Sequence, residues 1–199
     1  DLPVTIKTRL GIDDFDSYEF LSEFIETTSE YGCDHYILHA RKALLNGLSP
    51  KENRSIPPIN YPRVYKIKEQ YSDLKIEING EIKKVDEIKE HCEYVDGVMI
   101  GREACNNPLF LRVITSSIYR DSPMEMTDFF ERMFEYILKE SKDGTGVHFI
   151  TRHMTALFKG MPGAKEWRNL VGGLDSKKSN AEDLVRSMRL FVEERVTQH

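Results

Sequence analysis

The chain has 199 residues, is 40% hydrophobic and carries a formal net charge of -5 at pH 7, a size that suits one ordinary domain or one and a half small ones. No apolar run approaches the roughly 20 residues that cross a bilayer, and no basic and apolar leader opens the chain, so we expect a soluble protein. The three cysteines are odd in number and lack metal-ligand spacing, which predicts neither a disulfide framework nor a metal site. We expect Cys33, Cys92 and Cys105 to be small core residues in a reducing compartment.

Residues 1–112 show four successive strand and helix patterns. Short runs rich in β-branched or apolar residues predict the strands, and apolar residues at helical spacing predict the helices between them. The expected strands are residues 4–8, 36–39, 74–79 and 96–102, and the expected helices are residues 18–31, 61–70 and 85–92. Because no hairpin signal separates these units, they predict a parallel α/β sheet.

Four such units are half of a (β/α)8 barrel. A four-stranded parallel piece has two open edges and an uncovered face, so it should pair with a missing half or self-associate. The sequence opens almost at once in a strand, and such barrels have about 250 residues, so we expect about as many residues again before Asp1 in the intact protein. The predicted fold class is therefore α/β, the second half of a (β/α)8 TIM barrel in residues 1–112, followed by an all-α helical domain in residues 113–199.

The second domain is predicted from amphipathic patterns. Apolar residues recur at helical spacing from Met126 to Leu138 and again from about Gly146 to Phe158, where a Gly-Met-Pro-Gly turn follows. Two further helices are expected at residues 164–171 and 181–196.

Each predicted strand ends in polar or glycine residues. These are Lys7, His39, Asn79-Gly80 and Gly101-Arg102. In a barrel such ends converge on one pocket. The two glycine-containing pairs predict a phosphate site made of backbone N-H groups and a guanidinium, with the lysine and histidine beside the ring system of a phosphorylated cofactor. Each group alone is as compatible with a structural role, and the prediction depends on their occurrence in four consecutive units.

Two stretches of this acidic chain are basic. Residues 41–68 hold seven Lys or Arg against one acid, and residues 148–178 hold six against two. A polyanion bound at the mouth of the site would explain both basic stretches, since two basic surfaces could bind one long anion together. A solvated loop is the alternative interpretation of the first stretch.

Several motifs together resemble the tRNA-dihydrouridine synthases. They are Lys7-Thr-Arg-Leu-Gly-Ile-Asp, His39-Ala-Arg-Lys-Ala, Gly47-Leu-Ser-Pro-Lys-Glu-Asn-Arg, Ile56-Pro-Pro-Ile-Asn-Tyr-Pro-Arg-Val-Tyr, Ile76-Glu-Ile-Asn-Gly and Asp96-Gly-Val-Met-Ile-Gly-Arg. The loop from Lys42 to Tyr65 resembles the A-type branch of that family. The resemblance covers residues 1 to about 112 almost continuously, and the Gly-Met-Pro-Gly-Ala-Lys-Glu-Trp run at residues 160–167 resembles the family's helical tail.

The resemblance implies an FMN-dependent barrel joined to a helical tRNA-binding domain. It implies reduction of the 5,6 double bond of D-loop uridines, with NADPH reducing the flavin. By position, Lys7 and His39 match contacts to the flavin ring, while the phosphate and ribitol contacts match Asn79, Gly80, Glu81, Gly101 and Arg102. The expected tRNA contacts are Arg41, Lys51, Arg54, Arg152, Lys165 and Arg168, with Lys159 in the same tail. Trp167 fits a core residue better than a base-stacking platform.

Two features limit what the resemblance assigns. The family's general acid is a cysteine on the loop after an earlier strand, which would precede Asp1, so no catalytic residue is assigned and the fragment alone is expected to be inactive. The family usually has Asn-Gly-Gly where this chain has Asn79-Gly80-Glu81. We expect the Glu81 carboxylate to turn to solvent, and the phosphate affinity to be weaker.

Two other functions remain open at the level of the sequence. One is a barrel enzyme acting on a small phosphorylated metabolite, with the helical tail as an oligomerisation module. The other is a non-catalytic RNA-binding fragment. A cytoplasmic location is expected, with an organelle as the alternative.

Overall fold

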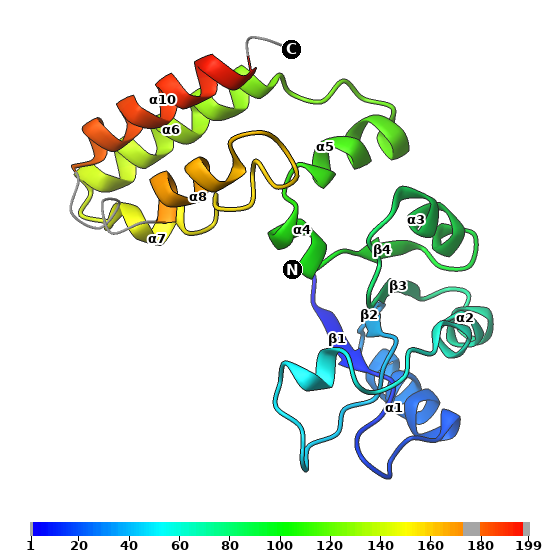
Figure 1. Ribbon diagram of the computed structural model, residues 1–199. Helices are drawn as coiled ribbons and strands as arrows, with labels where there is room; N and C mark the ends of the chain where they lie inside the picture. Colours follow the sequence, from blue (N-terminus) through cyan, green and yellow to red (C-terminus); the bar gives the residue numbers. More distant parts are fainter. Residues whose placement is uncertain (1, 173–179, 197–199) are drawn as a thin grey trace. The chain divides into compact units, whose positions relative to one another are not determined.

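The structure of the chain is a computed structural model that describes residues 2–172 and 180–196 (Figure 1). The chain divides into two compact units, Asp1–Arg102 and Glu103–His199. The division comes before residue 112, at which the sequence analysis placed the domain boundary. Each unit is described by itself below.

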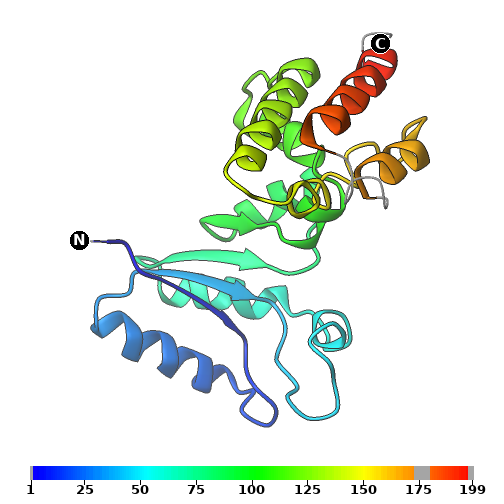
Figure 2. The same cartoon turned by 90° about the vertical axis from the view of Figure 1, so that its left-hand side faces the viewer.

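The first unit contains a four-stranded sheet whose strands run in one direction (Figure 2). They are β1 (Thr5–Arg9), β2 (His35–His39), β3 (Lys75–Asn79) and β4 (Gly97–Met99), and each pairs in parallel with the next in the order β1-β2-β3-β4. The predicted parallel α/β sheet is confirmed, and the strand positions agree with the sequence patterns to within a few residues at their ends.

Three helices connect these strands: α1 (Tyr18–Glu30), α2 (Tyr61–Gln70) and α3 (Val85–Cys92). Two of them, α1 and α2, begin where the sequence supplies a cap: the Ser17 side chain accepts from the Phe20 N-H, and the Asn60 side chain accepts from the Arg63 N-H. Right-handed crossovers between strands that are neighbours in both sequence and sheet place every helix on the same side. Figure 1 shows α1, α2 and α3 on one side of the sheet.

The two faces of the sheet therefore differ. The face under the helices carries the side chains of Tyr36, Leu38, Ile76 and Ile78, which are fully buried. Side chains alternate along a strand, so the other face carries Lys7, Arg9, His35, Ile37, His39, Glu77 and Asn79. Ile37 is buried and the others are polar. In the described structure no helix of this unit covers this face. A sheet with helices on one face only and polar strand ends on the other is what a segment of barrel wall would have.

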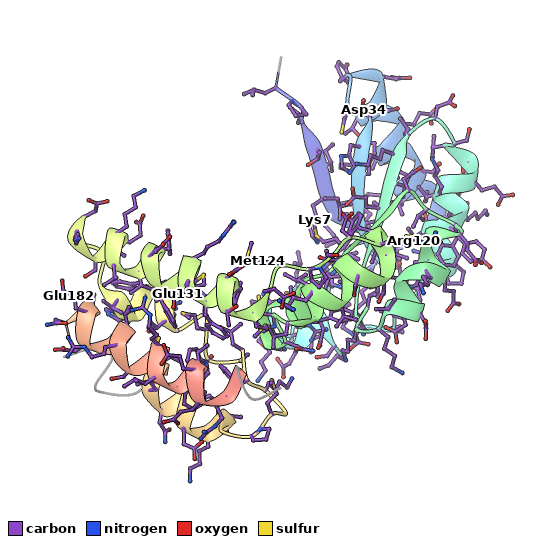
Figure 3. The ribbon with its side chains drawn as sticks, turned by 90° about the horizontal axis from the view of Figure 1, so that it is seen from above. Lys7, Asp34, Arg120, Met124, Glu131 and Glu182 are labelled. Atoms are coloured by element: carbon purple, nitrogen blue, oxygen red, sulfur yellow. The ribbon has the colours of Figure 1, made fainter. Side chains whose placement is uncertain are left out.

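The second unit contains helices and no strand among its described residues. Its helices are α4 (Arg102–Asn106), which begins at the division, α5 (Phe110–Ile114), a π-helical turn (Thr115–Tyr119), α6 (Met126–Lys142), α7 (Val147–Thr151), α8 (Ala164–Gly172) and α10 (Ala181–Val196). Phe130, Phe134 and Ile137 of α6 pack with Trp167 of α8 and with Met188 of α10 in a closed apolar core. An ion pair joins the exposed faces of α6 and α10, where Nε and Nη2 of Arg189 donate to the Glu131 carboxylate at 2.9 and 2.7 Å (Glu131 is labelled in Figure 3).

One predicted helix is wrong in length. The helix expected from about Gly146 to Phe158 ends at Thr151, and residues 152–160 continue as turns. The backbone N-H groups of His153, Met154 and Leu157 each bond to the carbonyl three residues earlier rather than four. The Met154 carbonyl also accepts the indole N-H of Trp167 at 2.7 Å. A carbonyl that would accept a backbone N-H in a helix is therefore bonded to a side chain of the core.

The cysteine prediction is correct for one residue. Cys33 is buried, but Cys92 and Cys105 are exposed. Cys92 is the last residue of α3, and Cys105 lies in α4, which has no buried residue, so composition alone does not reveal their exposure. No group of three or more His, Cys, Asp or Glu able to hold a metal ion occurs among residues 2–172 and 180–196. In the same part of the chain, every helix is too short or too polar to cross a membrane.

Candidate functional site

The strand ends of the first unit lie side by side at one level. The register aligns Arg9 with His39, His39 with Asn79, and Asn79 with Met99. The Asn79 side-chain amide donates to the Met99 carbonyl at 2.8 Å, and its oxygen accepts from Lys7 Nζ at 3.2 Å. Lys7 lies on the edge strand β1 (labelled in Figure 3), and burial together with the neighbouring Arg9 lowers its pKa. The structure thus brings together Lys7, His39 and Asn79, three of the predicted cofactor-binding residues.

His39 is neutral at physiological pH. Burial lowers its pKa to about 4, and repulsion from Arg9, Lys7, Arg41 and Arg102 acts in the same direction. A neutral imidazole can donate from one ring nitrogen and accept at the other. It therefore adds a hydrogen-bonding group to a cationic site without adding charge.

The pKa of His39 predicts how stability changes with pH. An unfolded histidine binds its proton near pH 6.5, so between about pH 4 and 6.5 the unfolded state holds more protons than the folded one. Stability should therefore rise with pH over this window. In His39→Gln, the rise in the free energy of unfolding across this window should be smaller by about 1 kcal/mol. Solvent screening of the partly exposed ring keeps this difference below what the full pKa shift would give. Urea denaturation of the flavin-free intact protein across this window, compared between wild type and variant, measures the difference; parallel profiles would contradict the assignment.

A strained turn follows β3. Gly80 has φ +135°, and a Cβ there would lie 3.2 Å from His39 Cδ2, so only glycine fits. Glu81 follows with φ +55°, a left-handed conformation that non-glycine residues seldom adopt. Tyr61 Oη donates to the Gly80 carbonyl at 2.7 Å and fixes the turn. Sequence reasoning did not single out Tyr61, and its place in the first turn of a helix gave no signal of this role.

The Glu81 side chain does not turn to solvent as expected. Its carboxylate lies 2.8 Å from Arg41 Nη2 and 3.7 Å from Arg102 Nη2. The reason is the density of guanidinium groups at this edge of the sheet, which attract a carboxylate more strongly than water does in a partly buried position. Arg102 also donates to the Arg54 carbonyl at 3.1 Å.

Two arginines hold the long loop that follows β2. Arg9 Nη1 donates to the carbonyls of Lys42 and Asn53 at 2.8 Å each. Arg41 is only 4% exposed, and its guanidinium donates to the carbonyls of Ser55 and Pro57. In this arrangement Arg41, which was expected to contact tRNA, faces the protein and shapes the loop. Its Nε is buried and without a partner in the described structure.

The basic character of residues 41–68 is largely compensated by folding. Lys42 and Arg63 both pair with Asp16, at 3.2 and 2.7 Å, and Lys68 pairs with Asp96 at 2.9 Å. Lys51 and Arg54, next to the short 3-10 turn Glu52–Arg54, are exposed, and their side chains make no ion pair within the described residues. The cations available to a polyanion are therefore fewer than the sequence count suggested.

In the second unit, the predicted cations Arg152, Lys165 and Arg168 are exposed, as is Lys159. Lys165 and Arg168 lie three residues apart on α8 and share a face. Trp167, between them, points the other way and is fully buried, so its interpretation as a core residue is confirmed. Lys177 and Lys178 of the predicted basic stretch lie outside the described residues.

These features define a class of fold before any comparison. The first unit is a parallel α/β unit with cationic and glycine residues at the carboxyl ends of adjacent strands, the edge at which such folds build their ligand sites. A separate helical unit presents exposed cations without ion-pair partners among the residues described.

Comparison with known proteins identifies the family. The family model for dihydrouridine synthase (Dus) matches residues 1–192. This chain belongs to the dihydrouridine synthase family.

Several curated relatives are tRNA-dihydrouridine(20/20a) synthases. The chain is 50% identical to one from Vibrio vulnificus over 174 residues, which cover 86% of this chain and 53% of that protein. It is 50% identical to one from Escherichia coli K12 over 173 residues, 85% of this chain and 50% of that protein. A Pasteurella multocida protein is 44% identical over 193 residues, 96% of this chain and 59% of its own. The chain thus spans about half the length of the curated relatives it matches.

Proposed function

We propose that the intact protein carrying this chain reduces uridine to 5,6-dihydrouridine in the D-loop of tRNA, with bound FMN as the redox group and NADPH as reductant. The observation that carries the proposal is the convergence of Lys7, His39 and Asn79 at the strand ends of a chain that belongs to this family. The names of the relatives support the tRNA substrate.

The residues present fit a flavin phosphate. A Cβ at Gly101 would meet nothing within 4 Å, so the backbone there is open to a ligand. Arg102, next to it, is about half exposed and supplies a guanidinium. FMN when bound would supply hydride transfer, which no amino-acid side chain performs. In this proposal Asn79, Gly80, Gly101, Arg102 and the backbone N-H of Glu81 hold the phosphate and ribitol.

Lys7 and His39 would lie against the flavin ring in this proposal. Burial and Arg9 lower the pKa of Lys7, and its ammonium group would stabilise negative charge on the ring. Neutral His39 would donate or accept a hydrogen bond. The group that protonates the uracil is not assigned to any residue of this chain.

The chain is further proposed to form the second half of the (β/α)8 barrel and a helical tRNA-binding domain. The uncovered polar face of the sheet and the open edges at β1 and β4 would then be completed by the rest of the barrel. Alone, the 199 residues are expected to lack activity because half of the pocket would be missing. The cytoplasm, where tRNA is modified, is the proposed location.

The direct test is a reduction assay. Intact protein is incubated with unmodified tRNA, FMN and NADPH, and the tRNA is digested and analysed for dihydrouridine. The expected result is dihydrouridine that depends on NADPH. A flavin-loaded protein that consumes NADPH with a small phosphorylated metabolite but leaves tRNA unchanged would contradict the proposal and favour the metabolite alternative.

The tRNA side of the proposal predicts a change in salt dependence. Replacing Arg152, Lys165 and Arg168 by alanine should weaken tRNA binding and lower the slope of log K against log salt by about 1 for each lost phosphate contact. Fluorescence anisotropy of labelled tRNA over a salt series measures both quantities. The matched control replaces three exposed cations of α6 and α10, Arg132, Lys139 and Arg186, by alanine. Equal slopes in the two triple variants would show that α7 and α8 do not form the tRNA surface.

A further inference from the structure

The position of Glu81 points to competition between its carboxylate and another anion for one arginine side chain. Glu81 lies in the strained turn between Gly80 and the start of α3, and its carboxylate faces Arg41 and Arg102. The two contacts are unequal. The 2.8 Å contact to Arg41 is a normal charged hydrogen bond, whereas the 3.7 Å contact to Arg102 is a longer ion pair that a better acceptor can replace.

The two arginines also differ in what else they contact. Arg41 is buried and additionally held by the carbonyls of Ser55 and Pro57. Arg102 is 48% exposed and donates to one carbonyl, that of Arg54. Arg102 is therefore the cation that a phosphate from solvent can reach, and Arg41 is the anchor that keeps the carboxylate nearby.

We propose that the Glu81 carboxylate competes with the phosphate of the flavin for Arg102, so that this chain discriminates FMN from riboflavin less than a chain with glycine at position 81 would. The proposal rests on the proposed function, because it needs the flavin phosphate to bind beside Arg102. A carboxylate and a phosphate dianion on the same guanidinium repel each other across a few ångströms of partly buried space. Riboflavin has the same ring and ribityl chain without phosphate, and its binding should not respond to Glu81.

The opposite effect of Glu81, stronger FMN binding, also has a physical basis, and the experiment distinguishes the two. A carboxylate paired with an arginine can fix its orientation, and a fixed guanidinium binds phosphate at a smaller entropic cost. Loss of Glu81 would then weaken FMN binding. Repulsion is expected to win because Arg102 already has a second partner, the Arg54 carbonyl, that orients it without adding charge.

The experiment measures the ratio of the riboflavin and FMN dissociation constants by quenching of flavin fluorescence in the intact protein. Wild type is compared with Glu81→Gln, which removes the charge and keeps the side-chain size. Glu81→Gly is the second variant, because it also relieves the left-handed backbone and so remains informative if the glutamine variant folds poorly. The control is Glu93→Gln, which removes the same charge from an exposed position at the end of α3.

The expected result is a ratio about tenfold higher in both Glu81 variants, caused by tighter FMN binding, with riboflavin affinity and the control unchanged. An unchanged or lower ratio in both variants, with both flavins still binding, would overturn the competition and leave the proposed function intact. Failure of wild type and variants to bind either flavin would overturn the proposed function and this inference with it.

Discussion

Trp167→Ala is expected to destabilise the helical unit by about 3–5 kcal/mol. The indole is fully buried, and its N-H donates to the Met154 carbonyl. Its ring lies 4.9 Å from that of Phe158 and 5.6 Å from that of Phe130, measured between centroids. Truncation removes these contacts, leaves a cavity, and takes one of two donors from the Met154 carbonyl, whose other donor is the Leu157 N-H.

Thermal and urea denaturation followed by circular dichroism measure this loss. Arg168→Ala, the exposed neighbour on α8, is the control and should change stability by less than about 0.5 kcal/mol. The same pair separates a core role from base stacking. If Trp167→Ala left stability unchanged but weakened tRNA binding, the assignment of this residue to the core would be wrong.

Arg41→Ala is expected to destabilise the first unit by roughly 2–3 kcal/mol and to loosen the loop after β2. The substitution leaves the carbonyls of Ser55 and Pro57 without their donor and deprives Glu81 of its nearer partner. The expected loss of stability is moderate because Glu81 is partly exposed and water can solvate its carboxylate in the variant.

Limited proteolysis of the loop, together with urea denaturation, checks this prediction. Arg54→Ala removes an exposed guanidinium from the same loop and serves as the control. Arg54→Ala should leave cleavage and stability unchanged while weakening tRNA binding. The reverse pattern, with Arg54→Ala destabilising and Arg41→Ala neutral, would contradict the structural role of Arg41.

The strands and most helices were predictable because local signals and tertiary structure agree. Residues 36–38 form an apolar run buried on both sides, and Asn60 and Pro62 mark the start of α2 by capping and by the position of proline. Where a core contact overrides the local pattern, prediction fails. The end of α7 is the example, because Trp167, outside the helix in sequence, takes the Met154 carbonyl.

The positions of the candidate residues at the strand ends were predictable, but their contacts were not. The strand-end positions of Lys7, His39 and Asn79 follow from the parallel order of the strands. Charge counting along the sequence could not show that Asp16 and Asp96 neutralise Lys42, Arg63 and Lys68, because these pairs join residues that are distant along the chain. The Glu81 carboxylate was misplaced for the same reason, since both of its partners come from other loops.

The measurement that tests the central claim most directly is the visible absorption spectrum of the purified intact protein, followed by identification of any released chromophore. We predict a flavin spectrum and release of FMN from the wild type, and weaker flavin binding in Lys7→Ala and in Arg102→Ala. A colourless protein that added FMN cannot reconstitute would contradict the assignment of Lys7, His39 and Arg102 as cofactor ligands.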